Sequence, residues 1–491
     1  MVINMTVSDY FFLSIFYFLA SSTALSLGIG YYTIYRPIMA GLITGFILND
    51  LQTGMLAGAV VNIIYIDFVS TGGSLKGDQC LTAVVAAVAA IALKLNILEA
   101  AAIAYPFGFL GILIWKYRLK INNIFVHIYE KRYKENKYPD ISLYDGLFPQ
   151  LLLYVMSSAV ILTALLLMFL FNKLINFTTI DILLYYAGIV LVVFSAFNIL
   201  YKIKNKYNLI IFASLFLLAL IFQIKAYLLL LVLSIILLLI TDKKIKLTNN
   251  KPTGIIKKRD LIYSWFIWKN YSHSCYSYER LMGLAFAHSM KNILKKLYGK
   301  QEDISDAIHN HTEFFNTEPN MGTPILGYII ALEEKRKLEN QSFESANISY
   351  IKKGMMGISA GLGDSFTQVV LTPLFISMSV MLSLYKSYYL ALIPILVLSS
   401  YIIFISYSGF MNGYFHGKES MLHRIKQVKQ SKIKIYFPYL FSGILGLSMG
   451  KLLFNDISPY ENIFTLIIVL LVSVFTFIRK RGEKWKREKW E

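Results

Sequence analysis

The chain has 491 residues, of which 56% are hydrophobic and only 16% are charged, and its mean hydropathy is +0.56. Many apolar stretches approach or exceed the roughly 20 residues that a helix needs to cross a bilayer, which excludes an ordinary soluble protein. The net charge of +19 does not indicate binding to nucleic acid, because the basic residues lie in short connections and tails. We therefore predict an all-α polytopic membrane protein.

The first half predicts nine membrane segments joined by short connections. They lie near 10–31, 35–49, 53–69, 80–94, 97–115, 148–171, 180–200, 208–222 and 225–241. Basic stretches at 116–137, 202–206 and 243–259 are separated from one another by two crossings, so the positive-inside rule places all three in the cytoplasm as loops. The last stretch also contains Pro252 and Gly254 and predicts a linker over 243–260.

The second half has a different character. Residues 261–353 are amphipathic and charged, and we expect them to face the cytoplasm, whereas apolar segments return near 355–384, 387–408, 436–453 and 462–478. The basic tail 479–491 is expected to stop transfer through the membrane, and it could also bind anionic lipid. We therefore predict a domain over 1–242, a basic linker over 243–260 and a second domain over 261–491, with membrane segments in 354–478.

A glycine-rich stretch in the second half predicts a broken helix. Four glycines from Gly354 to Gly363 interrupt an apolar run and end on Asp364. Each glycine costs a helix about 1 kcal/mol relative to alanine, so we expect a broken or re-entrant segment. The alternative is a close helix–helix contact made by small residues, with Asp364 as a helix cap.

A similar pattern occurs in the first half. An apolar run contains Asn62 and Asp67, breaks at Gly72 and Gly73, and ends at Asp78. Matching interrupted segments in the two halves of a chain are typical of a transport site near the middle of the membrane. The alternatives are a simple turn at the glycines and a hydrogen bond from Asn62 to a neighbouring helix.

The middle region contains residues that could suggest chemistry. His309, His311 and Glu313 have a spacing that could bind a metal on a strand or loop, but no further ligand is evident, so we expect no metal site. Glu333 and Glu334 precede three basic residues and predict a solvated helix face. No nucleophile triad, P-loop or dinucleotide motif is present in a suitable context. The two cysteines form no CxxC or metal-ligand pattern. We therefore expect no catalytic residue and no cofactor.

Several ordered motifs carry a resemblance to a known family. In 1–242 they are Arg36-Pro37, the segment 41–53, and Gly58-Ala59 followed by Gly72 and Asp78. In 261–478 they are Tyr278-Glu279-Arg280, Leu297-Tyr298, Phe314-Phe315-Asn316-Thr317-x-Pro319, Glu333-Glu334, Lys353-Gly354 and Met356-Gly357 followed by Ala360-Gly361-Leu362-Gly363-Asp364. With these motifs the chain resembles the IIC and IID membrane components of the mannose/fructose/sorbose family of the bacterial sugar phosphotransferase system, fused into one chain.

The resemblance implies a sugar permease in the bacterial cytoplasmic membrane. In that family IIC and IID together form the sugar channel, and separate cytoplasmic IIA and IIB units pass phosphate to the incoming sugar. The expected partners are therefore a hexose-type sugar and IIA/IIB units, and the phosphate-carrying residue lies on another protein. Pairs of IIC and IID assemble as trimers in the family, which implies a homotrimer here. Residues 261–353 are expected to help to present the docking surface for IIB.

We expect five polar residues to bind the solute between the two glycine-rich segments. Carboxylates and amides can form paired hydrogen bonds with neighbouring sugar hydroxyls, and inside a membrane they are tolerated only where they face protein or a wet cavity. The five candidates are Asn62, Asp67, Asp78, Asn316 and Asp364.

Departures from the family pattern leave the sugar open. Many IIC proteins have Glu at the position of Asn62, and the usual Met-Gly-Pro-Leu-Ala-Gly of IID reads Met356-Gly357-Ile358-Ser359-Ala360-Gly361 here. Two alternatives to a sugar permease therefore stay open. One is an uncoupled permease for another small polar solute, and the other is a membrane receptor or scaffold that transports nothing.

Overall fold

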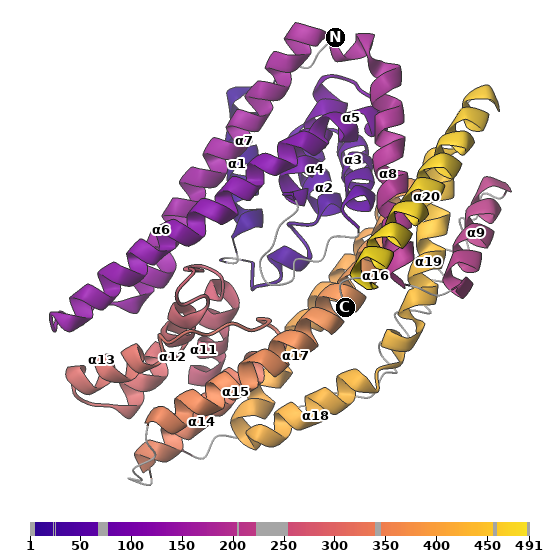
Figure 1. The fold of residues 1–491 in the computed structure, drawn as a ribbon. Helices are drawn as coiled ribbons and strands as arrows, with labels where there is room; N and C mark the ends of the chain where they lie inside the picture. The colour runs from indigo at the N-terminus through magenta and orange to yellow at the C-terminus, as the bar shows by residue number, and fades with distance from the viewer. Residues whose placement is uncertain are drawn as a thin grey trace.

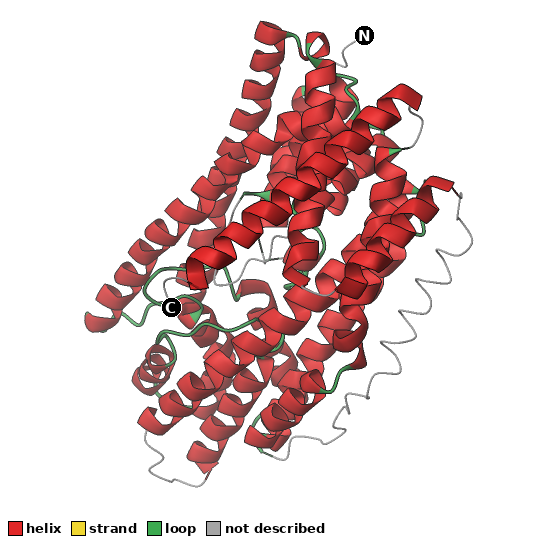
Figure 2. Cartoon of the chain, turned by 45° about the vertical axis from the view of Figure 1, so that its right-hand side comes forward, coloured by secondary structure: helices red, strands yellow, loops and turns green. Residues whose placement is uncertain are grey.

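The computed structural model describes residues 5–22, 24, 26–66, 77–203, 206–221, 254–338, 345–454 and 459–488. Within these ranges the regular elements are helices and no strand is present, as Figure 2 shows. Among the described residues, five helical segments are long and apolar enough to cross a membrane: Ile97–Lys134, Leu143–Ile175, Asp181–Ile203, Ile348–Leu384 and Leu392–His416. The prediction of an all-helical polytopic membrane protein is confirmed.

The N-terminal part of the chain contains both long and short helices. The helices of this part are α1 Val7–Ser21, α2 Pro37–Ile47, α3 Leu51–Ile64, α4 Gln79–Ala92, α5 Ile97–Ala104, α6 Gly108–Lys134, α7 Phe148–Ile175, α8 Asp181–Ile203 and α9 Lys206–Ile221, with the short turns η1 Gly30–Tyr32, η2 Tyr105–Phe107, η3 Leu143–Leu147 and η4 Phe177–Thr179. The short helices α2, α3, α4 and α5 lie between the long helices α6 and α7 on one side and α8 on the other (Figure 1). Helices α2, α3 and α4 have 11, 14 and 14 residues. At 1.5 Å per residue they are about 17 to 21 Å long, which is too short to cross a bilayer alone.

Glycines hold α2 and α3 in direct backbone contact. A Cβ atom at Gly41 or Gly45 would collide with the backbone of α3, and one at Gly54 or Gly58 would collide with the backbone of α2. Each helix therefore carries a glycine pair at a spacing of four, the pattern that lets membrane helices approach closely. The short helix α4 packs against this pair and has all 14 of its residues buried, as expected for the centre of a bundle.

The C-terminal helices form the rest of the structure. They are α11 Lys258–Tyr271, α12 Gly283–Leu297, α13 Gln301–Asn310, α14 Thr323–Leu338, α15 Ser345–Gly363, η5 Asp364–Leu371, α16 Thr372–Leu384, α17 Leu392–His416, α18 Lys418–Lys429, α19 Lys432–Leu453 and α20 Pro459–Glu488. The expected membrane segment 225–241 and most of the expected linker lie outside the described residues.

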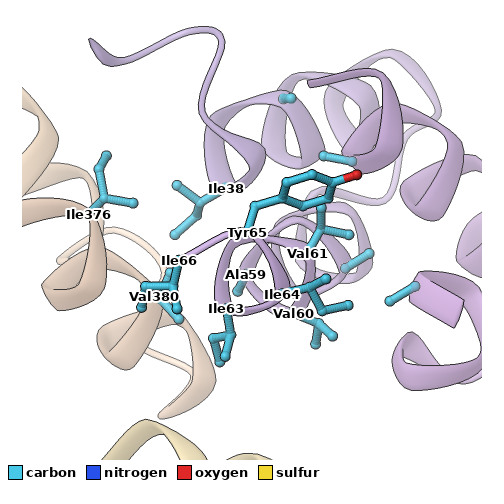
Figure 3. Packing of buried hydrophobic residues seen from close by; sticks show 14 of the residues in the cluster. Ile38, Ala59, Val60, Val61, Ile63, Ile64, Tyr65, Ile66, Ile376 and Val380 are labelled. Carbon is cyan, nitrogen blue, oxygen red and sulfur yellow. The ribbon is translucent and has the colours of Figure 1, made fainter. Parts of the chain in front are cut away.

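The two halves of the chain share a hydrophobic core. Helix α16 packs on α2 and α3, α19 packs on α9, and α20 packs on α8. Figure 3 shows Ile376 and Val380 of α16 in the same cluster as Ile38 and Ile66 of the first half. A second cluster joins α11, α12, α13 and α14 with residues of α6 and η3. Contacts between the halves therefore occur in both clusters.

The helix break expected at Gly354–Gly363 is wrong. Helix α15 runs through all four glycines, and the π-helix η5 continues it directly into α16. Backbone groups inside a membrane must be hydrogen-bonded within the segment, which outweighs the propensity cost of glycine. The irregularity is instead the widened π turn, a feature often found at functional sites. There, Thr367 Oγ1 donates to the carbonyl of Gly363 over 2.7 Å. Asp364 lies inside this continuous helix and does not cap it.

The loop expected at 116–137 is also wrong, because α6 continues to Lys134. The end of α6 lies against the C-terminal part. His127 pairs with Glu279 over 2.8 Å, and Tyr133 donates to Asp306 over 2.8 Å. These long-range contacts keep the basic stretch helical, so its charges extend the membrane helix and do not form a separate loop.

Glu333 and Glu334 do not form a solvated face. Their exposed fractions are 3% and 6%. Glu333 accepts a hydrogen bond from Tyr298 over 2.9 Å and pairs with His311 over 3.1 Å. Although burial raises its pKa, the bonds with His311 and Tyr298 lower the pKa of Glu333 overall. Glu334 accepts bonds from the backbone of residue 256 and the hydroxyl of Tyr414. Fully bonded carboxylates can be buried, and these partners are too distant in sequence for a local charge pattern to reveal.

His309, His311 and Glu313, whose spacing could suit a metal site, each bind a different partner. His309 pairs with Glu130 over 3.0 Å, His311 pairs with Glu333, and Glu313 pairs with Lys353 over 3.0 Å. No group of three or more His, Cys, Asp or Glu side chains among the described residues could hold a metal ion.

Candidate solute-binding site

A cavity of about 140 Å³ lies between the N-terminal and C-terminal parts of the chain, and it has room for several water molecules. Aromatic rings and fixed polar groups form most of its wall, which is the usual composition of a site for a small polar molecule. The residues that line it are Ala20, Ser21, Ser22, Gly28, Tyr31, Tyr32, Tyr35, Asp78, Ile114, Trp115, Arg118 and Leu153 from the first half, and Ser272, His273, Tyr276, Met282, Asn316, Thr317, Glu318, Pro319, Ala360, Asp364 and Gln368 from the second.

Asp78 is held rigidly in the cavity wall. It is the N-cap of α4, where its Oδ1 atom accepts a hydrogen bond from the amide of Leu81 over 2.9 Å. Its Oδ2 atom accepts a bond from the hydroxyl of Tyr17 over 2.6 Å. Gly111 of α6 lies directly against this carboxylate, and a side chain there would collide with it. Asp78 holds this position because it caps the N-terminus of the short helix α4, and the capping bond fixes its carboxylate.

Asn316 and Asp364 reach the same cavity from the second half. Tyr276 donates to Asn316 Oδ1 over 3.2 Å, and the amide of Asn316 lies 3.1 Å from the sulfur of Met356. Asp364 is the first residue of the π turn, and its Oδ1 accepts a bond from Gln368 over 2.9 Å. The π turn therefore places the acid Asp364 and the amide of Gln368, four residues apart in the sequence, on the cavity wall.

Glu318 is a cavity residue that the sequence analysis missed. It occupies the unspecified position of the motif that contains Asn316 and Thr317, and only 2% of its surface is exposed. Its carboxylate accepts a bond from Tyr32 of the first half over 2.5 Å, and it also accepts bonds from the following loop. A signal was available, because an acidic residue immediately follows the polar pair of the motif.

The cavity also contains a buried cation. Arg118 is 3% exposed, and its Nη2 donates to the carbonyls of His273 over 2.5 Å and Ser274 over 2.9 Å. Its Nε atom has no hydrogen-bond partner in the described part of the chain. Burial, followed by the charge of Arg118, lowers the pKa of His273 to about 3, so that imidazole is neutral near pH 7. Arg118 is therefore a buried cation held in the cavity wall by backbone carbonyls of the second half.

A buried lysine lies behind the cavity. Lys269 of α11 is fully buried and donates to the side chain of Asn320. Burial lowers the pKa of Lys269 to about 7, against the opposing effect of the Glu318 carboxylate. Its charge therefore varies near physiological pH.

One of the five expected residues, Asn62, does not line this cavity. Asn62 lies in α3 with 7% of its surface exposed, and its Oδ1 has no partner within the described ranges, but it does not line the cavity. Asp67 lies outside the described residues. The structure thus gathers Asp78, Asn316 and Asp364 around one cavity and adds Glu318 and Arg118.

These features define a polytopic membrane protein with a polar cavity shared between two parts of one chain. The sequence-family model of the sorbose-specific IIC component of the phosphotransferase system matches residues 7–240. The sequence-family model of the mannose/fructose/sorbose family IID component matches residues 255–452. The chain belongs to the mannose/fructose/sorbose family of the phosphotransferase system, with a IIC-like part followed by a IID-like part. The resemblance found in the sequence is confirmed.

Curated relatives match individual parts of the chain. It is 34% identical over 139 residues to the sorbose-specific EIID component of Lacticaseibacillus casei, covering 28% of this chain and 49% of the relative. It is 30% identical over 169 residues to the fructose permease IID component of Bacillus subtilis, covering 34% of this chain and 60% of the relative. It is 28% identical over 109 residues to the sorbose-specific EIIC component of Klebsiella pneumoniae, covering 22% of this chain and 41% of the relative. The chain thus spans about half the length of the curated relatives it matches.

Among solved structures, the chain is similar to one chain of the mannose transporter ManYZ in complex with microcin E492. The identity is 23% and the TM-score is 0.32, with 48% of this chain and 91% of that chain covered.

Proposed function

We propose that the chain is the membrane translocation subunit of a sugar phosphotransferase system and takes up a hexose-type sugar. The observation that carries the proposal is the cavity between the two parts, in which both parts supply buried acids and aromatic rings. Carboxylate and amide oxygens accept bonds from sugar hydroxyls, while the rings cover the apolar faces of the sugar. Separate IIA and IIB units supply the phosphate, so no phosphate-carrying residue is required on this chain.

The proposed sugar site comprises the five residues named from the sequence together with Glu318. Asp78, Asn316 and Asp364 contact the sugar in the arrangement described here. Asn62 meets it when the short N-terminal helices change position, a role supported by its buried Oδ1, which has no hydrogen-bond partner among the described residues. Asp67 is included from the sequence alone. Asn62→Ala should then reduce uptake while expression and assembly remain intact. Normal transport by both Asn62→Ala and Asp67→Ala would remove these two residues from the site.

The proposed arrangement in the cell follows from the family. We assign 1–242 to the IIC-like domain, 243–260 to a basic linker and 261–491 to the IID-like domain, in the cytoplasmic membrane of a bacterium. The short apolar helices α2, α3 and α4 enter the membrane without crossing it, and three copies of the chain form a trimer. The exposed basic end of α6, which carries Lys131, Arg132 and Lys134, contributes to the docking surface for IIB.

Two measurements test the proposed function together. The first is co-purification of the chain with a IIB unit of the mannose family, compared with a variant in which the three basic residues at the end of α6 are reversed in charge. Electrostatic docking is screened by salt, so the reversal should weaken binding most at low ionic strength. The second is uptake of labelled hexoses with and without the phosphate relay. Uptake that requires the relay supports the proposal, whereas relay-independent uptake of another solute, or no uptake with any hexose, contradicts it.

A further inference from the structure

The carboxylate of Glu318 is surrounded by four hydrogen-bond donors. Its Oε1 atom accepts bonds from the hydroxyl of Tyr32 over 2.5 Å and from Asn320 Nδ2 over 2.9 Å. Its Oε2 atom accepts bonds from the amides of Asn320 over 3.1 Å and Met321 over 2.5 Å. A carboxylate offers about four acceptor sites, and here two donors face each of its two oxygen atoms. These four hydrogen bonds therefore fix the orientation of the Glu318 side chain in the cavity wall.

One of the four donors differs from the other three. Asn320 and Met321 lie two and three residues after Glu318 and move with the same loop, whereas Tyr32 belongs to η1 in the IIC-like part. The Tyr32–Glu318 bond therefore joins the two parts at the cavity. If it is broken, the three loop bonds still orient the carboxylate. The hydroxyl of Tyr32 is thus the one donor that can be exchanged without dismantling the site.

The position of this bond suits exchange with a ligand. Tyr32 and Glu318 both line the cavity, and Thr317 beside them has a buried hydroxyl with no partner in the described chain. Gly363 lies directly against Glu318, so no side chain there competes for the space. A phenol and a sugar alcohol are donors of the same kind toward a carboxylate, with O–H···O⁻ bonds near 2.5–2.7 Å.

We propose that Glu318 is a specificity-determining acceptor that holds the hydroxyl of Tyr32 and exchanges it for a hydroxyl of the transported sugar. Sugar binding then releases the IIC-like part from the IID-like part at this point, which links occupancy of the site to relative movement of the two parts. The inference rests on the proposed function as a hexose permease.

The test is the affinity of the purified full-length Tyr32→Phe variant for labelled hexoses, measured by equilibrium binding in detergent. The variant removes the competing donor and keeps the ring, so we expect the sugar to bind more tightly by about two- to tenfold, the range of one net hydrogen bond. Glu318→Gln should weaken binding by about tenfold or more, because the charged acceptor is lost. If Glu318→Gln fails to assemble, Tyr32→Phe still decides the question.

Tyr133→Phe is the matched control. Tyr133 also donates to a carboxylate across the two parts, that of Asp306 over 2.8 Å, but it lies outside the cavity lining, so its variant should bind sugar like the wild type. If the wild type binds a hexose and Tyr32→Phe binds it equally well or more weakly, the exchange is refuted and the proposed function stands. If the wild type binds none of the hexoses, the proposed function and the exchange both fall.

Discussion

Replacement of Gly54 in α3 by alanine should destabilise the protein, although alanine favours a helix more than glycine does. The propensity gain is about 1 kcal/mol. Against it, the new methyl group would collide with the backbone of Gly41 and Gly45 in α2, and overpacking of this kind costs about 1–3 kcal/mol. Backbone atoms cannot swing aside as a flexible side chain can, so α2 and α3 must separate. The net effect is a destabilisation of up to about 2 kcal/mol.

Gly357 of α15 provides the matched control. A Cβ atom there would meet no atom within 4 Å, so Gly357→Ala should keep the propensity gain and stabilise the protein by up to about 1 kcal/mol. The two variants should therefore differ by about 1–3 kcal/mol in opposite directions from the wild type. The assay is unfolding of the purified proteins in detergent, followed by circular dichroism. The packing argument is refuted if Gly54→Ala is as stable as Gly357→Ala.

Three further predictions follow from the structure. Asp364→Asn should give assembled protein with reduced sugar uptake, whereas loss of assembled protein on a gel-filtration column would mean that Asp364 is needed for folding and not for binding. Burial raises the pKa of Asp140, but hydrogen bonds from Lys291 and Ser142 lower it overall to about 2. The stability that the Asp140–Lys291 pair contributes to the fold is therefore present above about pH 4 and is lost as the pH falls toward 2. The loss of stability on acidification, measured by unfolding, should be smaller in Lys291→Ala. Finally, fragments 1–245 and 258–491, expressed as separate chains, should purify as one complex because the halves share a core, and recovery of only one fragment would contradict this.

The sequence predicted the class of fold because hydropathy and length report directly on membrane segments. It also directed attention to Asp78, Asn316 and Asp364, since polar residues next to apolar runs stand out. It missed Glu318, although this residue directly follows the polar pair of the motif, because the region 261–353 contains many charged residues and only the fold shows which of them are buried. Local charge patterns likewise predicted a solvated Glu333, whose partners Tyr298 and His311 are distant in sequence.

Local propensity failed in a second way at the glycine-rich segment. Four glycines between Gly354 and Gly363 predict a break, but the demand for hydrogen-bonded backbone in the membrane keeps α15 helical and moves the irregularity to the π turn that follows. The sequence contains two pairs of glycines at a spacing of four in α2 and α3, but no contact between the two segments was predicted from them. Their role became clear only when the structure showed the two backbones in contact.

The central claim is that a hexose binds in the cavity between the two parts, and protection of a cysteine placed there tests it most directly. Ala360 lines the cavity and is partly exposed, whereas the native Cys80 and Cys275 are buried and should react slowly. The measurement is the rate at which a small thiol reagent alkylates the purified Ala360→Cys variant with and without a hexose, with the exposed position Gln301→Cys as the control. We predict that one hexose slows alkylation at position 360 severalfold and leaves position 301 unchanged. Equal rates at position 360 with and without every hexose that the protein takes up would contradict the account.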